Sequence, residues 1–452
     1  MVMAVAQPEA SAVQPRTRGR WVRRVVRVAR TTPGRLASTG VVLVVLALLA
    51  GVFGFVAVKE RSDAAERVAT RSEPLAVRTQ ELYRSLADAD ATAAAALLSG
   101  GIEKPALRDR YEQDMDSAQR TLMAASSAGA TGNVAELLSR LSVEVPQYRE
   151  DVARAKTETR QGHTVGPAWL RAASKQMQDV ILVDAAALHE EAGKQLRRDH
   201  DRATGIPVAA MAAGALALAA LVVAQVWLAR RTKRVFNPGL LLACLSVAAL
   251  LVWVSVGLSS ARDRFTESRD GGWRPVEALS AARFAVLRAR GDEGQILVQR
   301  GTDNGKYEAD LNGEFADLSG STGDPAPEKR LLGEAARLSA GDPVTLADID
   351  KARGAVGDWQ TAHDGVNVKY ENVDYAGAVA EVIGDKGGSQ TAFDRADGAL
   401  ADAIKKDQAD FEKSVKQGRD ELAGLGVGVV VLAVLAAVGI VDGMRRRLGE
   451  YR

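Results

Sequence analysis

The amino-acid sequence predicts an all-α membrane protein with four spans and two extracytoplasmic antiparallel four-helix bundles, arranged as a tandem duplication. Three observations support this fold class: uncharged apolar stretches, arginine clusters beside them, and helical periodicity in the long segments between them. The apolar stretches are residues 40–58, 206–229, 239–258 and 425–441. About 20 apolar residues in a helix cross a hydrocarbon core of about 30 Å, so each stretch is predicted to be a transmembrane helix.

Basic residues cluster on one side of the membrane if the chain crosses it four times. The first 39 residues hold eight arginines and one acid. The positive-inside rule predicts that this side is the cytoplasm, which places both termini inside and both long segments outside the cell membrane of a multi-pass protein. The predicted inner-face residues are Arg23, Arg24, Arg27, Arg30, Arg230, Arg231, Lys233, Arg234, Arg445, Arg446 and Arg447.

The predicted domains follow from these boundaries. Residues 1–39 form an Arg-rich cytoplasmic tail, in which residues 21–30 are either a membrane-surface amphipathic helix or simple topogenic charge. No small-x-small cleavage site follows the first apolar stretch, so an uncleaved helix is favoured over a signal peptide. The remaining domains are helix 40–58, bundle 59–205, helix 206–229, basic loop 230–238, helix 239–258, bundle 259–424, helix 425–441 and basic tail 442–452.

Apolar residues at steps of three and four predict the seam of each bundle. In the first bundle the seam is Leu138, Leu141, Val145, Tyr148 and Val152, and in the second it is Ile349, Val356, Trp359 and Val366. The second seam matches the first at an offset of 211 residues, and Pro275 repeats Pro74, which predicts duplicated units. No turn signal is assigned between the last helix of each bundle and the following span, so each is expected to enter the membrane without a break.

The spans contain small residues at helical spacing and no strongly polar path. Ala210 and Gly214, and Gly424 and Gly428, are expected to let helices approach closely, either among the four spans or in a homo-oligomer. No catalytic, cofactor or metal motif is found: His189-Glu190-Glu191 lacks the second ligand of a zinc helix, because Gly193 stands there. The chain is therefore not expected to be an enzyme, to hold a cofactor or to bind nucleic acid.

A span, an exported four-helix bundle and a second span together resemble the ligand-binding region of chemoreceptors and sensor kinases. The doubled unit, the Arg-rich N-terminal tail and a composition rich in alanine and arginine resemble the actinobacterial GlnX family. That resemblance implies a link between a glutamine- or glutamate-binding lipoprotein outside and the serine/threonine kinase PknG inside. It is architectural, and no diagnostic motif transfers to individual residues.

The cytoplasmic segments are too short to contain an output domain, so any message must pass to a separate protein. We therefore expect a transmembrane signal transducer that relays an extracytoplasmic ligand or solute-binding-protein signal to a cytoplasmic signalling partner. The resemblance implies an amino-acid signal of the glutamate/glutamine type and a serine/threonine kinase as that partner. Two alternatives stay open: a non-switching envelope scaffold and an accessory subunit of a transporter. Beyond the lipid bilayer, the sequence leaves the ligand, the oligomeric state and the packing of the two bundles open.

Overall fold

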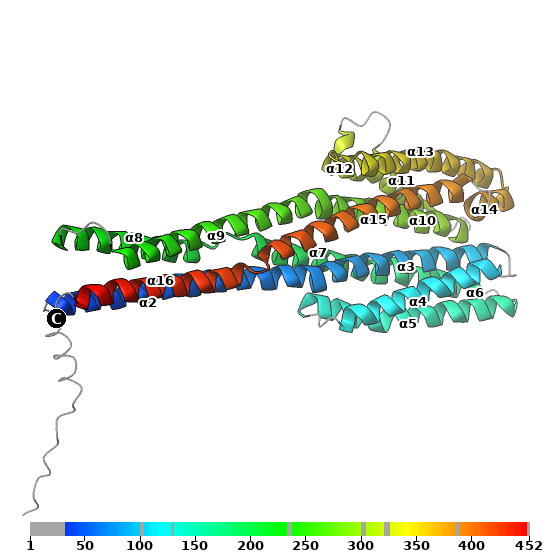
Figure 1. Ribbon diagram of the computed structural model, residues 1–452. Helices are drawn as coiled ribbons and strands as arrows, with labels where there is room; N and C mark the ends of the chain where they lie inside the picture. Colours follow the sequence, from blue (N-terminus) through cyan, green and yellow to red (C-terminus); the bar gives the residue numbers. More distant parts are fainter. Residues whose placement is uncertain are drawn as a thin grey trace, which may run out of the picture. The chain divides into compact units, whose positions relative to one another are not determined.

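The computed structural model describes residues 32–99, 104–127, 131–163, 165–232, 237–299, 304–320, 326–384 and 388–449. Within these ranges the chain is helical, with short π and 3₁₀ turns and no β-strand (Figure 1). The predicted all-α class is confirmed. The amphipathic stretch 21–30 lies outside the described residues.

The chain forms two compact units. We call the unit made of residues 1–59, 206–258 and 424–452 the membrane unit, and the unit made of Glu60–Gly205 and Ser259–Ala423 the bundle unit. The two long segments between the apolar stretches therefore share one unit. Within it, we call residues 60–205 the first bundle and residues 259–423 the second bundle.

Among the described residues, four helices are long and apolar enough to cross a membrane, which confirms the four predicted spans. They are α2 (Thr32–Arg67), α8 (Val208–Thr232), α9 (Pro238–Ser268) and α16 (Leu425–Gly449). Small and aliphatic side chains such as Ala50, Leu221 and Ala436 fill the core of the membrane unit. Large apolar side chains such as Val223 and Val434 are exposed, as expected for a surface that lies in lipid.

Glycines let the spans approach closely in the membrane unit. A Cβ atom added at Gly214 would lie 2.4 Å from Leu251, and one at Gly428 would lie 2.7 Å from the Trp253 indole nitrogen. Ala210 is buried. Gly424 differs from its predicted packing role, because a Cβ there would meet no atom within 4 Å. A close approach to another backbone lies elsewhere, where a Cβ at Gly239 would lie 2.5 Å from backbone atoms of α16.

The described part of the first bundle consists of four helical segments that follow one another in the chain: α3, α4, α5 and the continuous segment α6–η2–α7. Its α3 contacts α4 and α7, and its α5 contacts α4, α6 and α7. Leu138, Leu141, Val145, Tyr148 and Val152 are all buried on α5. The elements are η1 (Val68–Ser72), α3 (Glu73–Leu98), α4 (Pro105–Ser127), α5 (Asn133–Arg160), α6 (Gly166–Gln176), η2 (Met177–Ile181) and α7 (Leu182–Thr204).

The second bundle follows the same plan with added short helices. Its α10 contacts α11 and α15, and α13 packs along α15. Ile349, Val356, Trp359 and Val366 are all buried on α13. The elements are η3 (Arg269–Trp273), α10 (Arg274–Gln299), α11 (Asn304–Ser319), η4 (Pro327–Lys329), α12 (Leu331–Leu338), α13 (Pro343–Glu371), α14 (Tyr375–Ile383) and α15 (Gly388–Leu422).

A π turn stands at the same place in each bundle. Turn η3 repeats η1 at an offset of 201 residues, the offset that separates Pro275 from Pro74. The residue that follows each π turn donates its backbone N–H to the carbonyl oxygen five residues back, Glu73 to Val68 and Arg274 to Arg269. The proline that follows has no N–H and its ring crowds the preceding turn, which favours the wider π geometry.

The exits from the two bundles are interrupted, and the expectation of unbroken helices there is wrong. Helix α7 ends at Thr204 and α8 begins at Val208, with Gly205, Ile206 and Pro207 outside any helix. Helix α15 ends at Leu422 and α16 begins at Leu425. Proline disfavours helical geometry in the residue before it, and Gly424 takes a left-handed φ of 84° that ends a helix. By contrast, residues of α2, η1 and α3, and of α9, η3 and α10, follow one another without a break.

Candidate functional site: a charged cavity between the bundles

The two bundles meet along α3 and α10. The Tyr83 ring of α3 stacks on the Phe284 ring of α10 with centroids 3.9 Å apart and planes 24° apart. His189 of α7 meets the same Phe284 ring edge-on at 5.2 Å. Glu66 pairs with Arg419 at 2.9 Å near the other end of the interface. Aromatic stacking and ion pairs therefore hold the first helix of each bundle against the other bundle.

Beside this aromatic contact lies a cavity of about 710 Å³. Four elements line it: α3, the η2–α7 segment, α10 and α11. Its volume is within the range of small-molecule sites, about 300–1,000 Å³. Tyr83, Leu182 and Leu287 give it an apolar wall. The site thus has the size and the mixed lining that a small ligand requires.

The lining of the cavity is strongly acidic. Two basic side chains face it, and both are engaged: Arg288 donates two hydrogen bonds to Glu314, at 2.5 and 3.0 Å, and Lys306 Nζ lies 3.8 Å from Asp179. Against these two stand seven carboxylates, namely Asp90, Asp179, Glu190, Asp292, Asp310, Glu314 and Asp317. An excess of lining carboxylates creates a negative potential that attracts cations.

Asp292 is the most unusual of these carboxylates. It is only 9% exposed, and no hydrogen bond or ion pair joins it to any described residue. Burial, together with the neighbouring carboxylates of Asp310 and Glu314, raises the pKa of Asp292 to about 8, although Arg288 and Lys306 oppose the rise. A buried carboxyl group without a partner is costly, so this side chain favours a positively charged neighbour.

Asp90 connects the cavity to the core of the first bundle. Its carboxylate accepts hydrogen bonds from the Tyr148 hydroxyl at 3.0 Å and the Ser174 hydroxyl at 2.6 Å. Burial raises the pKa of Asp90 to about 6, although these two hydrogen bonds oppose the rise. Tyr148 is the predicted seam residue of α5, so the structure brings this seam position together with an acid of α3.

Glu293, the neighbour of Asp292, has the corresponding place in the second bundle. It accepts hydrogen bonds from the Trp359 indole at 3.1 Å, the Arg290 guanidinium at 3.0 Å and the Ser389 hydroxyl. His363 Nδ1 lies 3.2 Å from it. Burial alone would raise the pKa of Glu293, but His363, Arg290 and Ser389 hold it below its ordinary value.

His363 is held by two carboxylates in the same core. Burial lowers its pKa, but hydrogen bonds and charges from Glu293 and Glu308 outweigh burial and raise the pKa to about 9. Nε2 lies 3.3 Å from Glu308. In the described part of the chain, no group of three His, Cys, Asp or Glu side chains has the arrangement of a metal site. This histidine therefore acts as a charged partner in a buried network.

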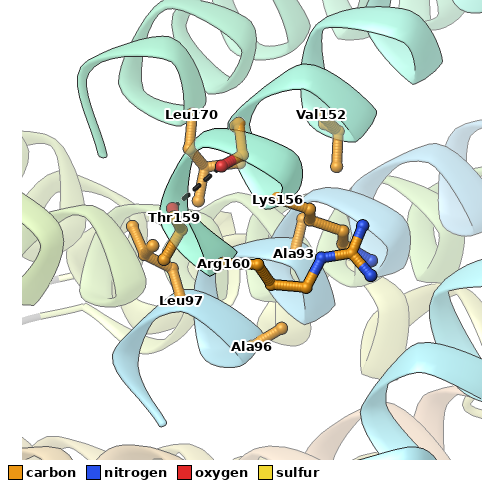
Figure 2. Close-up of a pocket in the computed structure, with 9 residues that line it drawn as sticks. Ala93, Ala96, Leu97, Val152, Lys156, Thr159, Arg160 and Leu170 are labelled. Carbon is orange, nitrogen blue, oxygen red and sulfur yellow. Dashed lines mark hydrogen bonds between the residues drawn. The ribbon is translucent and has the colours of Figure 1, made fainter. Parts of the chain in front are cut away.

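A smaller pocket lies inside the first bundle, and Figure 2 shows Ala93 and Ala96 of α3 facing α5 and Leu170 of α6. Its volume is about 40 Å³. The Thr159 hydroxyl donates to the Ala155 carbonyl at 2.8 Å, which satisfies the polar group beside it. A space of this size holds a few water molecules and no organic ligand.

The predicted inner-face basic residues fall partly outside the described chain. Arg230, Arg445 and Arg446 are exposed, and Arg446 pairs with Asp442 at 2.9 Å. Arg231 and Arg447 lie in α8 and α16, but their side chains are not described. The remaining residues of this set, Arg23, Arg24, Arg27, Arg30, Lys233 and Arg234, lie outside the described ranges.

Fold and site together define a four-span all-α membrane protein with two packed helical bundles. Residues 64–201, which make up nearly all of the first bundle, match the family model of the actinobacterial sensor domain. No curated protein and no solved structure matches the chain significantly. Residues 64–201 are therefore similar to an actinobacterial sensor domain, in a chain with four described helices able to cross a membrane, which supports the sensor class that the sequence predicted.

Proposed function

We propose that this protein is a transmembrane signal transducer with its bundle unit outside the cell membrane and both termini in the cytoplasm. The observation that carries the proposal is the sensor-domain match at residues 64–201 in a chain with four membrane-spanning helices. The extracytoplasmic signal is an amino acid of the glutamate/glutamine type or a binding protein that carries it. The receiver is a separate cytoplasmic protein such as a serine/threonine kinase, and the chain itself is not an enzyme.

The relay runs through the helices that lead from a span into a bundle without a break. Residues of α2, η1 and α3 are helical in succession, as are those of α9, η3 and α10. The breaks at Gly205–Pro207 and at Gly424 make the other two connections poor transmitters of rotation. Because α3 and α10 also line the cavity, a molecule there contacts both continuous paths. It shifts the spans only if it binds two arrangements of these helices with different affinity.

The relay is tested by disulfide crosslinking in the membrane unit after Cys244→Ser removes the single native cysteine. A Cβ at Gly54 on α2 would lie 3.3 Å from Val429 Cγ1 on α16, so Gly54→Cys with Val429→Cys forms a suitable pair. We expect its crosslinking rate in membranes to change when L-glutamine, L-glutamate or the cognate binding protein is added. An identical rate in every condition would show a scaffold that does not switch.

The topology is tested separately in whole cells with a membrane-impermeant maleimide. Ser127→Cys, at an exposed position of the first bundle, is expected to react, and Arg446→Cys, at an exposed position of α16, is expected to be protected. Arg446→Cys should react only after the cells are opened. Labelling of Arg446→Cys but not Ser127→Cys in intact cells would invert the proposed orientation.

A further inference from the structure

The position of Asp292 is suited to binding a ligand in the cavity between the bundles. It is nine-tenths buried, lines the cavity between the bundles, and has no hydrogen-bond or ion-pair partner among the described residues. The adjacent Glu293 has three hydrogen-bond donors and a histidine. One of two consecutive buried carboxylates is thus fully satisfied inside its own bundle, while the other faces the open cavity unsatisfied. Burying the charged form of a carboxyl group without a partner is costly, so a cation in the cavity would stabilise the charged form of Asp292.

The rest of the lining excludes an anion. The two basic side chains of the cavity are already paired, Arg288 with Glu314 and Lys306 with Asp179. A free carboxylate in a ligand would find no available cation and would face several negative groups. L-Glutamate is therefore a poor occupant, and a signal of that type would reach this protein through a carrier.

The lining also favours an organic cation over a metal ion. Within the described ranges no three potential ligands have metal-site geometry. Val183, Ala186 and Ala187 instead offer accessible apolar surface beside the carboxylates. An alkylammonium matches both features, because its ammonium group donates hydrogen bonds to a carboxylate and its methylene groups cover apolar side chains.

We propose that the cavity between the bundles binds a small alkylammonium ion, with its ammonium group paired to Asp292 and its alkyl chain against Val183, Ala186 and Ala187. This inference rests on the proposed function, since it makes the alkylammonium ion a second input to the same relay, beside a glutamate or glutamine signal that arrives through a carrier. The ligand joins α10, which holds Asp292, to α7, which holds Val183, and so contacts both bundles at once.

The test is calorimetric titration of the full-length protein in lipid nanodiscs at a pH above the Asp292 pKa of about 8, where most of this carboxyl group is charged, with putrescine as the probe and L-glutamate as the anionic comparison. We expect wild type to bind putrescine and not L-glutamate. Asp292→Asn keeps the size of the side chain and removes its charge, so it should lower the affinity for putrescine at least tenfold. Asp364→Asn is the matched control, because this exposed acid on α13 lies outside the cavity and should leave the affinity unchanged.

Ala309→Trp gives a second variant that does not alter a buried group. This alanine is exposed on α11 and lines the cavity, so a tryptophan there should fill the space and abolish binding. The inference is overturned if putrescine does not bind to wild type, or if Asp292→Asn and Ala309→Trp both keep wild-type affinity. Binding requires no cytoplasmic partner, so its failure would leave the crosslinking result intact. Putrescine binding that leaves the crosslinking rate of the Gly54→Cys and Val429→Cys pair unchanged would instead reject the cavity as a starting point of the relay.

Discussion

The two bundles bury a carboxylate in comparable places and compensate it in different ways. In each, an acid of the first long helix accepts a hydrogen bond from an aromatic side chain of the third, Tyr148 to Asp90 and Trp359 to Glu293. Asp90 receives only neutral hydroxyl donors and its pKa rises to about 6. Glu293 also accepts a hydrogen bond from the charged Arg290 guanidinium, and the pKa of Glu293 is lowered.

This difference shows that one helical plan supports two kinds of core. The first core holds one carboxyl group that only neutral hydroxyl groups compensate, and its pKa of about 6 means that it takes up a proton as the pH falls below that value. The second core is a charged network of Glu293, Arg290 and His363. Breaking a buried ion pair leaves an uncompensated charge, whereas losing neutral hydrogen bonds costs much less. The second bundle should therefore be the more sensitive of the two to changes in its central acid.

The largest expected effect is the contrast between Glu293→Gln and Asp90→Asn. Glu293→Gln leaves the buried Arg290 and His363 without their counter-charge and should reduce the free energy of unfolding by about 3–5 kcal/mol. Asp90→Asn keeps an acceptor for Tyr148 and Ser174 and should cost about 1 kcal/mol. Denaturant titration of the solubilised full chain measures both, with Asp364→Asn as the surface control. Equal losses in the two bundles would remove the distinction.

The next effect is a difference between the two bundle cores in how the free energy of unfolding depends on pH. His363 has a folded-state pKa of about 9, above its ordinary 6.5, so its stabilisation is complete below pH 6.5 and is lost as pH rises through 9. The loss should be roughly 2–3 kcal/mol. Glu293 on α10 and Glu308 on α11 face the ring, and Asn367 lies beside it on α13.

Asp90 should act over a different range. Its pKa is raised from 3.8 to about 6, so the folded state holds a proton that the unfolded state releases, and stability falls as pH rises from about 4 to about 6. Thermal unfolding between pH 4 and 10 measures both windows. His363→Gln should remove only the alkaline dependence and Asp90→Asn only the acidic one. If His363→Gln changes the profile below pH 6 instead, the assignment to the two bundles is incorrect.

The smallest effect compares one arginine with its counterpart 201 residues later. Arg61 is buried and donates from Nε and Nη2 to the Gly205 carbonyl, at 2.8 and 2.6 Å, at the broken end of the first bundle. Arg262 is exposed. Arg61→Met should therefore cost about 1–2 kcal/mol and Arg262→Met close to none, as measured by denaturant titration. A comparable loss in both variants would mean that the Gly205 contact is not what Arg61 contributes.

Sequence periodicity was sufficient for the fold and insufficient for the site. Residues such as Leu141 and Val356 are recognised because helical spacing alone places them on one buried face. The break at Pro207 was missed because residues 206 and 207 carry no charge and extend an apolar run, although a proline there signals a helix start. At the end of a helix, a proline or glycine is therefore a better indicator of the boundary than hydropathy is.

The cavity could not be found in this way, because it depends on which faces of two bundles meet. The sequence of α11 resembles an ordinary solvent-exposed helix face, which includes Lys306, Asp310 and Asp317. This face lines the cavity only because α10 packs against α3. Asp292 and Glu293 are adjacent acids in the sequence, and nothing local indicates that one lies in a core and the other in a cavity. Tertiary contacts between distant segments decide both roles.

The two π turns also affect how many residues each continuous helix contains per rotation. A π turn takes one residue more than the α turn that it replaces, and each residue advances a helix by about 100°. Deleting one residue from η1 or η3 would thus restore an ordinary α turn and leave the side chains beyond that point close to their present direction, because the deleted residue is the one that the π turn accommodates. Each continuous helix therefore contains one residue more than a regular α-helix of the same rotation needs, and each π turn can be made regular separately by a single-residue deletion.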